Sequence, residues 1–463
     1  MSAGIAAGHP ATADAGLEIL EEGGTAADAA VAASLASCVA ETVMTGFLGG
    51  GHAIYLDRAR GRVRNLDCFV AAPGLGAAPR ARELVELEVP FGQELVHYAV
   101  GPASCGVPGL PAGLELLWRE HGRLPWPRLV EPALALARSD VEMPPAHAAC
   151  LEMLAPVLTL DAGARIYSPG GRLLEAGDRL RQPGLVAALE LVASEGAGGV
   201  YRSTIAERLL ELADERGGLL TRGDLRAYAA CWSEPDALDY RGTRFLTRTG
   251  LSGVAGALGR LPRLAGAGAT GRTLALVSAL EGDAAPGETT NLAVADREGN
   301  ACVLTTSLGL GSGDYLPGLD LHLNSMLGET DLLRGPLDPG ERVGSMMAPS
   351  IALDGAGSGR LELAIGAAGG TRLRSALVAV AAAVLDEGVG AQEAVDRPRV
   401  HPAAGTVHAE PATDEPALVE LERRGWAVRR WPDRHHFFGG VSLVGRTGSA
   451  ADPRRSGAAM DLP

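Results

Sequence analysis

The sequence predicts a layered α/β body in which helices cover the faces of β-sheet. Segments with the two-residue period of strands alternate along the chain with amphipathic helical segments. The 463 residues are 46% hydrophobic but only 4% aromatic, so the core must consist mainly of Ala, Leu and Val. Sixty-three glycines and 29 prolines supply the turns between elements. Length alone allows two or three domains or one large body.

The N-terminal half is predicted to be rich in helices. A helical pattern begins at His9-Pro10, runs to Leu20 and ends at Gly23-Gly24. Thr25 followed by Asp28 is a capping-box pattern for a second, Ala-rich helix. Further helices are expected after Gly109 and Trp126, at 183–194 and 204–215, and from Thr221 onward.

A change of composition separates this half from the next. Residues 250–287 are rich in Gly, Ala and Pro, with one short helical run at 274–280, and we interpret them as an exposed connection. Period-two alternation then predicts a β-hairpin, with one strand over 289–296 and another over 301–304.

Two threonines stand at the start of this hairpin. A threonine that is the first residue of a chain can use its own α-amine as the base that activates its hydroxyl, because an α-amine titrates near about 7.7 to 8.0. Taken alone, Thr289 and Thr290 fit ordinary β-branched strand residues better than this chemistry.

A glycine turn follows a later strand. The strand over 363–366 leads through Gly369-Gly370 into a helix over 371–385. This order directs free backbone N–H groups at the helix start toward one point, where an oxyanion could bind. Strands near 400, 407 and 440–444 and a helix over 416–424 complete the pattern.

Composition excludes several classes of function. Acidic residues number 56 against 41 basic ones, all of them arginine, and a net charge of −15 argues against a nucleic-acid surface. The six cysteines are scattered without metal-binding spacing, so we expect them reduced and mostly buried, with no metal and no cofactor. Neither a leader peptide nor a membrane span is recognised, which makes the cytoplasm the expected location.

Several conspicuous residues receive structural interpretations. Gly49-Gly50-Gly51 lacks the Lys-Ser/Thr of a phosphate loop and fits close packing at a strand start. His52 is expected to pack in that strand. Adjacent His435 and His436 in a strand would point to opposite faces and cannot easily share a metal. Asp452-Pro453-Arg454 is expected to form a terminal turn with an ion pair.

Taken in order, the motifs resemble those of the γ-glutamyltransferases, which are N-terminal nucleophile (Ntn) hydrolases. The likeness covers nearly the whole length, and its motifs, each weak alone, are specific as an ordered series. They are His9-Pro10-Ala11-Thr12, Ile19-Leu20, Gly23-Gly24, Asp28–Ala32, Gly49–Gly51, Gly106–Gly109, Glu131–Ala133, Gly218–Leu220, Asp224-Leu225, Thr289-Thr290, Ala348–Ser350, Gly369-Gly370 and Asp452–Arg454.

The resemblance implies a four-layer αββα sandwich made as an inactive precursor. The precursor would cut itself between Glu288 and Thr289, giving a large subunit (1–288) and a small subunit (289–463) that together form one body. Thr289 would then be the nucleophile, and Glu288, Thr289 and Thr290 the processing site. An acyl group would pass from a small-molecule donor to water or an amine.

The same resemblance implies roles for other residues. Gly369 and Gly370 correspond to the oxyanion hole, and Ser307 to a hydroxyl beside the nucleophile. Ser345 corresponds to a contact for the substrate carboxylate. Glu329 stands where the family usually has an aspartate that holds the substrate amino group.

This chain also departs from the family pattern. The family's arginine for the glutamyl α-carboxylate is replaced by Phe69, within the run Asp67–Pro73. Losing such a partner typically costs about 2 to 5 kcal/mol. Gly309 lies near a family asparagine, Met346 replaces the second of two serines, and the segment before Thr289 is short. We therefore expect a pocket less polar than one built for glutamate.

Three functions remain open at this point. The first is a γ-glutamyltransferase-like enzyme acting on a glutamyl or related acyl compound. The second is a specialised natural-product hydrolase that cleaves an amide, or a carbon–carbon bond next to a carbonyl. The third is an uncut, catalytically silent binding or scaffold protein, which the retained threonines and glycine turn disfavour.

Overall fold

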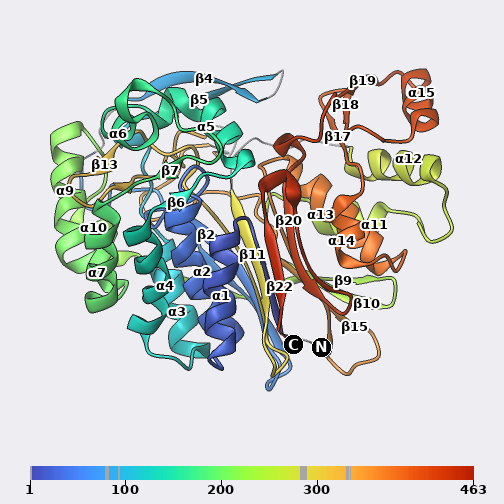
Figure 1. The fold of residues 1–463 in the computed structure, drawn as a ribbon, viewed down its shortest axis with the longest axis horizontal. Coiled ribbons are helices and arrows are strands. Elements are labelled where there is room, and N and C mark those ends of the chain that lie inside the picture. The colour runs from blue at the N-terminus through green and yellow to red at the C-terminus, as the bar shows by residue number, and fades with distance from the viewer. Residues whose placement is uncertain are drawn as a thin grey trace.

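Two antiparallel sheets lie face to face between layers of helices in the computed structural model (Figure 1). The structure describes residues 3–78, 83–91, 94–281, 289–329, 333 and 335–462. The predicted αββα sandwich is confirmed. None of the described helices is long and apolar enough to cross a membrane.

The first sheet has seven strands, and β11, which follows the predicted nucleophile Thr289 and is called the nucleophile strand below, lies near its centre. In spatial order they are β22 (Ala458–Asp461), β1 (Gly4–Ala7), β11 (Thr290–Ala295), β12 (Ala301–Ser307), β2 (Gly50–Asp57), β3 (Arg62–Cys68) and β8 (Cys231–Ser233). Both strands of the predicted hairpin are present as β11 and β12. Every residue of these two strands is buried, because one face of the sheet meets helices and the other meets the second sheet.

The second sheet has six strands and carries the glycine turn. In spatial order they are β21 (Gly448–Ala451), β20 (Gly440–Gly445), β16 (Leu361–Ala368), β15 (Ser350–Asp354), β10 (Thr243–Thr247) and β9 (Asp236–Tyr240). An apolar layer between the sheets is formed by small and branched side chains such as Ile54, Val303, Ile351 and Val444.

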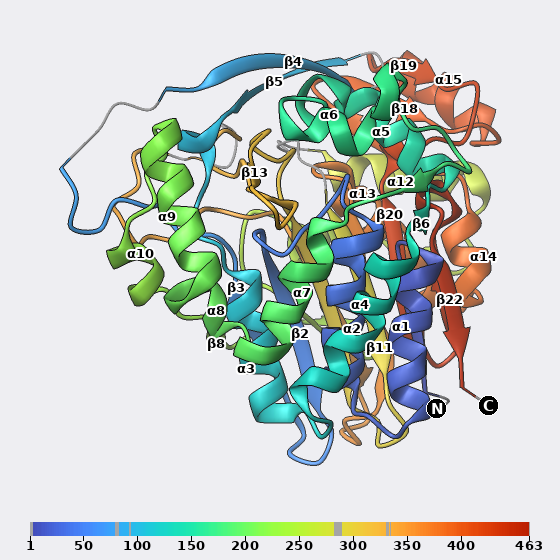
Figure 2. The ribbon, with the colours of Figure 1, turned by 60° about the vertical axis from the view of Figure 1, so that its left-hand side comes forward.

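Helices cover the outer face of each sheet, as the turned view also shows (Figure 2). The first sheet is covered mainly by α1 (Pro10–Glu21), α2 (Ala26–Ala40), α3 (Leu110–His121) and α4 (Trp126–Ser139), and the second by α11 (Val254–Arg260), α13 (Arg372–Leu385) and α14 (Ala391–Asp396). The predicted capping box at Thr25 and Asp28 is present and opens α2.

The remaining elements surround this sandwich. The other helices are α5 (Pro145–Leu158), α6 (Ala162–Tyr167), α7 (Gly184–Glu195), α8 (Gly198–Arg202), α9 (Thr204–Arg216), α10 (Arg222–Ala227), α12 (Ala269–Leu280) and α15 (Glu415–Arg423). Small sheets are formed by β4 (Val85–Phe91) with β5 (Glu94–Val100), β6 (Val141–Glu142) with β7 (Arg179–Leu180), β13 (Tyr315–Leu316) with β14 (Leu321–His322), and β17 (Val400–Ala403), β18 (Thr406–Ala409) and β19 (Ala427–Arg430).

Strand register brings the candidate residues to one edge of the sandwich. β12 ends at Ser307, which pairs with Gly50 at the start of β2, and β11 begins at Thr290 opposite Thr306. In the second sheet, β16 ends at Ala368 opposite Gly440. The start of β11 and the end of β16 lie at the same edge, because Thr289 and Gly369, which flank them, are hydrogen-bonded to each other.

Two sequence-based predictions were wrong. Residues 250–281 are not an exposed connection, because α11 and α12 place Val254, Leu258 and Val277 in the core of the second half. His435 and His436 are not in a strand: His436 starts a 3₁₀ turn, and their rings lie 4.1 Å apart. A high content of alanine and glycine does not distinguish buried helices from loops, because small residues are typical of both loops and tightly packed helices.

Candidate active site

Thr289 lies at the strand edge with its hydroxyl on the glycine turn. It is 6% exposed and directly precedes β11. The backbone N–H of Gly369 donates a hydrogen bond to Thr289 Oγ1 at 2.9 Å. The two residues are eighty positions apart, and each is placed by a different sheet. The structure therefore brings the predicted nucleophile to the predicted oxyanion site, while Glu288 lies outside the described residues.

The glycine turn requires the absence of side chains. Gly369 has φ 114° and Gly370 has φ 55°, both in the region that favours glycine. A Cβ on Gly369 would lie 2.9 Å from Cα of Gly439 and 3.0 Å from Nη2 of Arg455. The carbonyls of both glycines accept hydrogen bonds from the first turn of α13, each at 3.1 Å. The Gly369 amide is thus held rigidly toward Thr289.

A polar residue ties the two sheets together directly below the nucleophile. Asn291 Oδ1 accepts from the Ser442 amide at 3.1 Å, and Asn291 Nδ2 donates to the Gly440 carbonyl at 3.2 Å. Ser442 Oγ donates back to the Asn291 carbonyl at 3.2 Å. Because these bonds connect β11 to β20, they set the distance between the nucleophile strand and the sheet that carries Gly369.

Three predicted residues form a second cluster at the end of β12. The Gly309 amide donates to Ser307 Oγ at 2.8 Å. Gly309 has φ 69°, and a Cβ there would lie 2.5 Å from Glu329 Oε1 and 2.7 Å from Ser325 Oγ. Ser307 is one residue beyond the pair Thr290–Thr306, so the predicted neighbour of the nucleophile lies on the adjacent strand. Glu329 is 5% exposed and lies against the backbone of this turn.

The predicted carboxylate region is apolar at its centre. Phe69 is 1% exposed and packs in one cluster with Val343, Met347 and the half-buried Met346. Its ring stacks on His52 at 5.3 Å. Ser345 is buried, and its Oγ accepts from the Met347 amide at 3.2 Å.

Two arginines approach this apolar cluster from other elements. Arg342 donates to the Phe69 carbonyl at 3.2 Å and lies 3.7 Å from Asp67. Arg248 donates to the Ser345 carbonyl at 2.9 Å, and burial lowers its pKa to about 10. The cluster thus has an aromatic ring at position 69, where the resemblance predicts an arginine in the family, while positive charge lies near its rim.

Two charged residues that the sequence analysis missed lie beside the nucleophile strand. Glu41 at the end of α2 accepts hydrogen bonds from Thr12 Oγ1 at 2.7 Å and from Thr290 Oγ1. Arg455 lines a small pocket together with Thr289 and Thr290, and its Nη1 lies 3.5 Å from Met44 Sδ. The available signals were a lone acid at the end of an apolar helix and a second arginine after the Asp-Pro-Arg motif.

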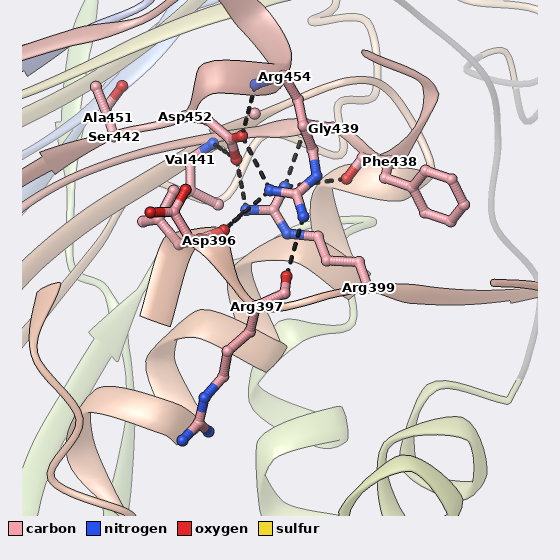
Figure 3. A network of polar contacts seen from close by, with 12 residues as sticks. Asp396, Arg397, Arg399, Phe438, Gly439, Val441, Ser442, Ala451, Asp452 and Arg454 are labelled. Atoms are coloured by element: carbon pink, nitrogen blue, oxygen red, sulfur yellow. Dashed lines mark hydrogen bonds and ion pairs between the residues drawn. The ribbon is translucent and has the colours of Figure 1, made fainter. Parts of the chain in front are cut away.

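A buried ion-pair network supports the wall of this pocket (Figure 3). Asp452 is 2% exposed, pairs with Arg399 and Arg454, and accepts from the Val441 amide at 3.0 Å. Arg454 also donates to Glu410 Oε1 at 2.6 Å. The turn and ion pair predicted for Asp452–Arg454 are confirmed. The network fixes the start of β20 and the segment that carries Arg455.

We expect Asp452→Ala to lower the free energy of unfolding by about 3 to 5 kcal/mol, because it leaves buried arginines without their partner. Chemical denaturation measures the change. Asp396→Ala, which removes an exposed partner of Arg434 at 3.5 Å, is the matched control and should cost less than about 1 kcal/mol. Equal losses for the two variants would contradict a structural role for the network.

Among the residues that the structure describes, no three His, Cys, Asp or Glu side chains gather as metal ligands. Five of the six cysteines are buried and all six are outside disulfide bonds, as predicted.

Comparison with known proteins identifies the family of this chain. The model of the family described as gamma-glutamyltranspeptidase matches residues 12–262 and 268–462. The chain belongs to the gamma-glutamyltranspeptidase family. The resemblance inferred from its motifs is thereby confirmed.

Relatives of this gamma-glutamyltranspeptidase-family chain fall into two groups. It is 29% identical to the acylase ACY 1 proenzyme of Pseudomonas sp. (strain V22), over 95% of this chain and 89% of that protein. It is 34% identical to the glutathione hydrolase proenzyme of Escherichia coli (strain K12), over 52% of this chain and 41% of that protein. The relatives are hydrolases, which supports an enzyme of this family.

Solved structures agree on the fold of this family. A cephalosporin acylase from Bacillus halodurans superposes with a TM-score of 0.82 at 23% identity, over 100% of this chain and 96% of that one. At this identity the likeness concerns the fold alone. The chain thus has the Ntn-hydrolase fold and belongs to the gamma-glutamyltranspeptidase family, and acylases and glutathione hydrolases are among its relatives.

Proposed function

We propose that this protein is a self-cleaving acylase that hydrolyses or transfers a small acyl group through an ester on Thr289. The observation that carries this proposal is the Gly369 amide bonded to Thr289 Oγ1 at 2.9 Å. A hydroxyl at the start of a central strand, held against a rigid amide donor, has the geometry needed to attack a carbonyl and to stabilise the resulting oxyanion.

Self-cleavage would follow from this geometry. Thr289 Oγ1 attacks the carbonyl carbon of Glu288, and the carbon–nitrogen bond of that peptide breaks to leave an ester and a free Thr289 amine. Water then hydrolyses the ester, which releases the Glu288 carboxylate and restores the hydroxyl. The products are a chain of residues 1–288 and a chain of residues 289–463.

Turnover would repeat the attack on a substrate. The Thr289 α-amine takes the hydroxyl proton while Oγ1 adds to the acyl carbon, and the Gly369 amide donates to the oxyanion. The amine then returns the proton to the leaving nitrogen, and an acyl-enzyme remains. Water or an amine acceptor removes the acyl group by the reverse sequence of proton transfers.

The substrate class is proposed from the apolar cluster. Phe69 and Met346 occupy the region where a glutamyl α-carboxylate would need a charged partner, so the acyl group is expected to differ from glutamyl. The relative matched over nearly its whole length carries the name acylase, whereas the glutathione hydrolase matches about half of this chain. Both observations favour a non-glutamyl amide.

The test of substrate class compares chromogenic anilides on the purified protein. We expect the butyryl anilide, which lacks the carboxylate, to exceed the glutaryl and γ-glutamyl anilides, which both carry it, in kcat/KM by at least about 30-fold, which corresponds to about 2 kcal/mol. A γ-glutamyl anilide turned over as fast as the other two would overturn the non-glutamyl assignment. A protein that stays uncut and turns over none of the three would instead indicate the binding or scaffold role.

A further inference from the structure

A buried carboxyl group lies beneath the residue that follows the nucleophile. Glu41 is 1% exposed and stands at the end of α2. Its Oε1 accepts from Thr12 Oγ1 of α1 at 2.7 Å, and its Oε2 accepts from Thr290 Oγ1 at the start of β11. One side chain thus connects two helices of the outer layer to the nucleophile strand.

The backbone beside this carboxyl group has no room for a side chain. A side chain on Gly8 of the neighbouring strand end would collide with both Glu41 Oε2 and Thr290 Oγ1. Burying a carboxyl group costs free energy unless its oxygens are hydrogen-bonded, and here both oxygens accept from threonine hydroxyls. A hydrophobic residue would satisfy the core at lower cost, so packing alone does not explain an acid at this position.

We propose that Glu41 is a positioning residue: through Thr290 it holds the start of β11, so that Thr289 keeps its hydroxyl on the Gly369 amide after the chain has been cut. This inference rests on the self-cleavage proposed above. It adds a residue that touches neither substrate nor reacting atoms.

The need for such an anchor arises from the cut itself. In the uncut chain, the peptide bond to Glu288 restrains Thr289 from one side. After cleavage Thr289 is a chain terminus, and terminal residues become mobile unless they are tied down. Thr290 follows Thr289 directly, and the Thr290 hydroxyl is hydrogen-bonded to Glu41. A misplacement of about 1 Å can cost about 10²-fold in rate.

The protonation state of Glu41 also affects the hydrogen bond that it accepts from Thr290. Burial raises the pKa of Glu41 to about 7, although the bonds from Thr290 and Thr12 and the charge of Arg455 oppose the shift. Among the described residues, Cys38 on the same helix and Arg455 near the C-terminus are the titratable or charged groups that interact with it electrostatically. Below this pKa the carboxyl group is neutral, and the hydrogen bond from Thr290 Oγ1 no longer has a charged acceptor.

The first experiment removes the hydrogen bond between Thr290 and Glu41 and keeps the shape of the side chain at position 290. We expect Thr290→Val to lower kcat by about 10- to 100-fold on the best anilide substrate, with KM within about twofold of the native value. Thr12→Val is the matched control, because it removes the other hydrogen bond to Glu41 without touching β11, and it should change kcat less than threefold. Equal kcat values for Thr290→Val and the native protein would overturn the proposal.

The second experiment tests the carboxyl itself. We expect the native pH–kcat profile to contain a transition near pH 7 that Glu41→Gln lacks. Exposed Glu152→Gln should leave the profile unchanged. A native protein that is neither cut nor active refutes the proposed function. An active, cut protein whose profile is the same with Glu41→Gln refutes the positioning role alone, so the two failures are distinguishable.

Discussion

Thr289→Ala is expected to leave one intact chain and to reduce amide hydrolysis by at least about a thousandfold. Alanine keeps the strand but removes the oxygen that would attack both the Glu288 carbonyl and the substrate. Because Thr289 is almost fully buried and its hydroxyl bonds to Gly369, the substitution removes only a few atoms from a packed site. A denaturing gel of freshly purified protein measures cleavage, and an anilide assay measures turnover.

A matched set of variants separates the hydroxyl from the fold. Thr289→Ser retains an attacking oxygen and is expected to cut itself, though more slowly, because serine lacks the methyl group that fixes the rotamer. Native protein should give two chains that meet between residues 288 and 289, which N-terminal sequencing of the smaller chain would establish. A native protein that remains one chain, or a Thr289→Ala variant that is cut at the same bond, would refute the mechanism.

Gly369→Ala is expected to lower kcat by about 10² to 10³-fold. The methyl group would lie 2.9 Å from Cα of Gly439, and the backbone has φ 114°, which a side chain rarely adopts. Relief of this clash moves the amide away from Thr289 Oγ1, so an oxyanion donor is lost. Single-turnover measurements of acyl transfer from an anilide would show the loss in the chemical step.

Gly405→Ala provides the control for backbone strain. Gly405 also has a positive φ, 77°, but nothing lies within 4 Å of the position where its Cβ would stand, and it occupies the turn between β17 and β18. We expect this variant to lose some stability and almost no activity. If both alanine variants lost activity equally, general destabilisation would explain the effect, and the amide of Gly369 would have no special role.

The sequence predicted the parts of the site that local rules govern. The hairpin at Thr289 follows from two-residue alternation, and the turn at Gly369 follows from strand–glycine–helix order. The meeting of these two segments does not follow from either pattern. It depends on the pairing of thirteen strands into two sheets, and it entered the sequence analysis only through the family resemblance.

The contact partners of other residues in the site had no local signal. Glu41 follows an alanine-rich helix in which every residue is buried, and nothing in the sequence shows that Thr290 lies across from it 249 residues later. Arg248 follows the end of another strand, and its contact with Ser345 was likewise not predictable from the sequence. Long-range partners of single polar residues are set by tertiary packing, to which periodicity and capping rules are insensitive.

The order of the strands determines whether the two halves of the chain could be produced separately. β11 lies between β1 and β12, β12 pairs with β2, and β10 pairs with β15, so each sheet combines strands from before and from after position 289. Neither half contains a complete sheet, and each would expose strands buried on both faces. Genes encoding the halves separately are therefore expected to yield insoluble polypeptides, whereas the polypeptide made from a single gene would fold before the proposed cut. The intact chain would thus be needed to form the two sheets, and the separate fragments would not be expected to form them.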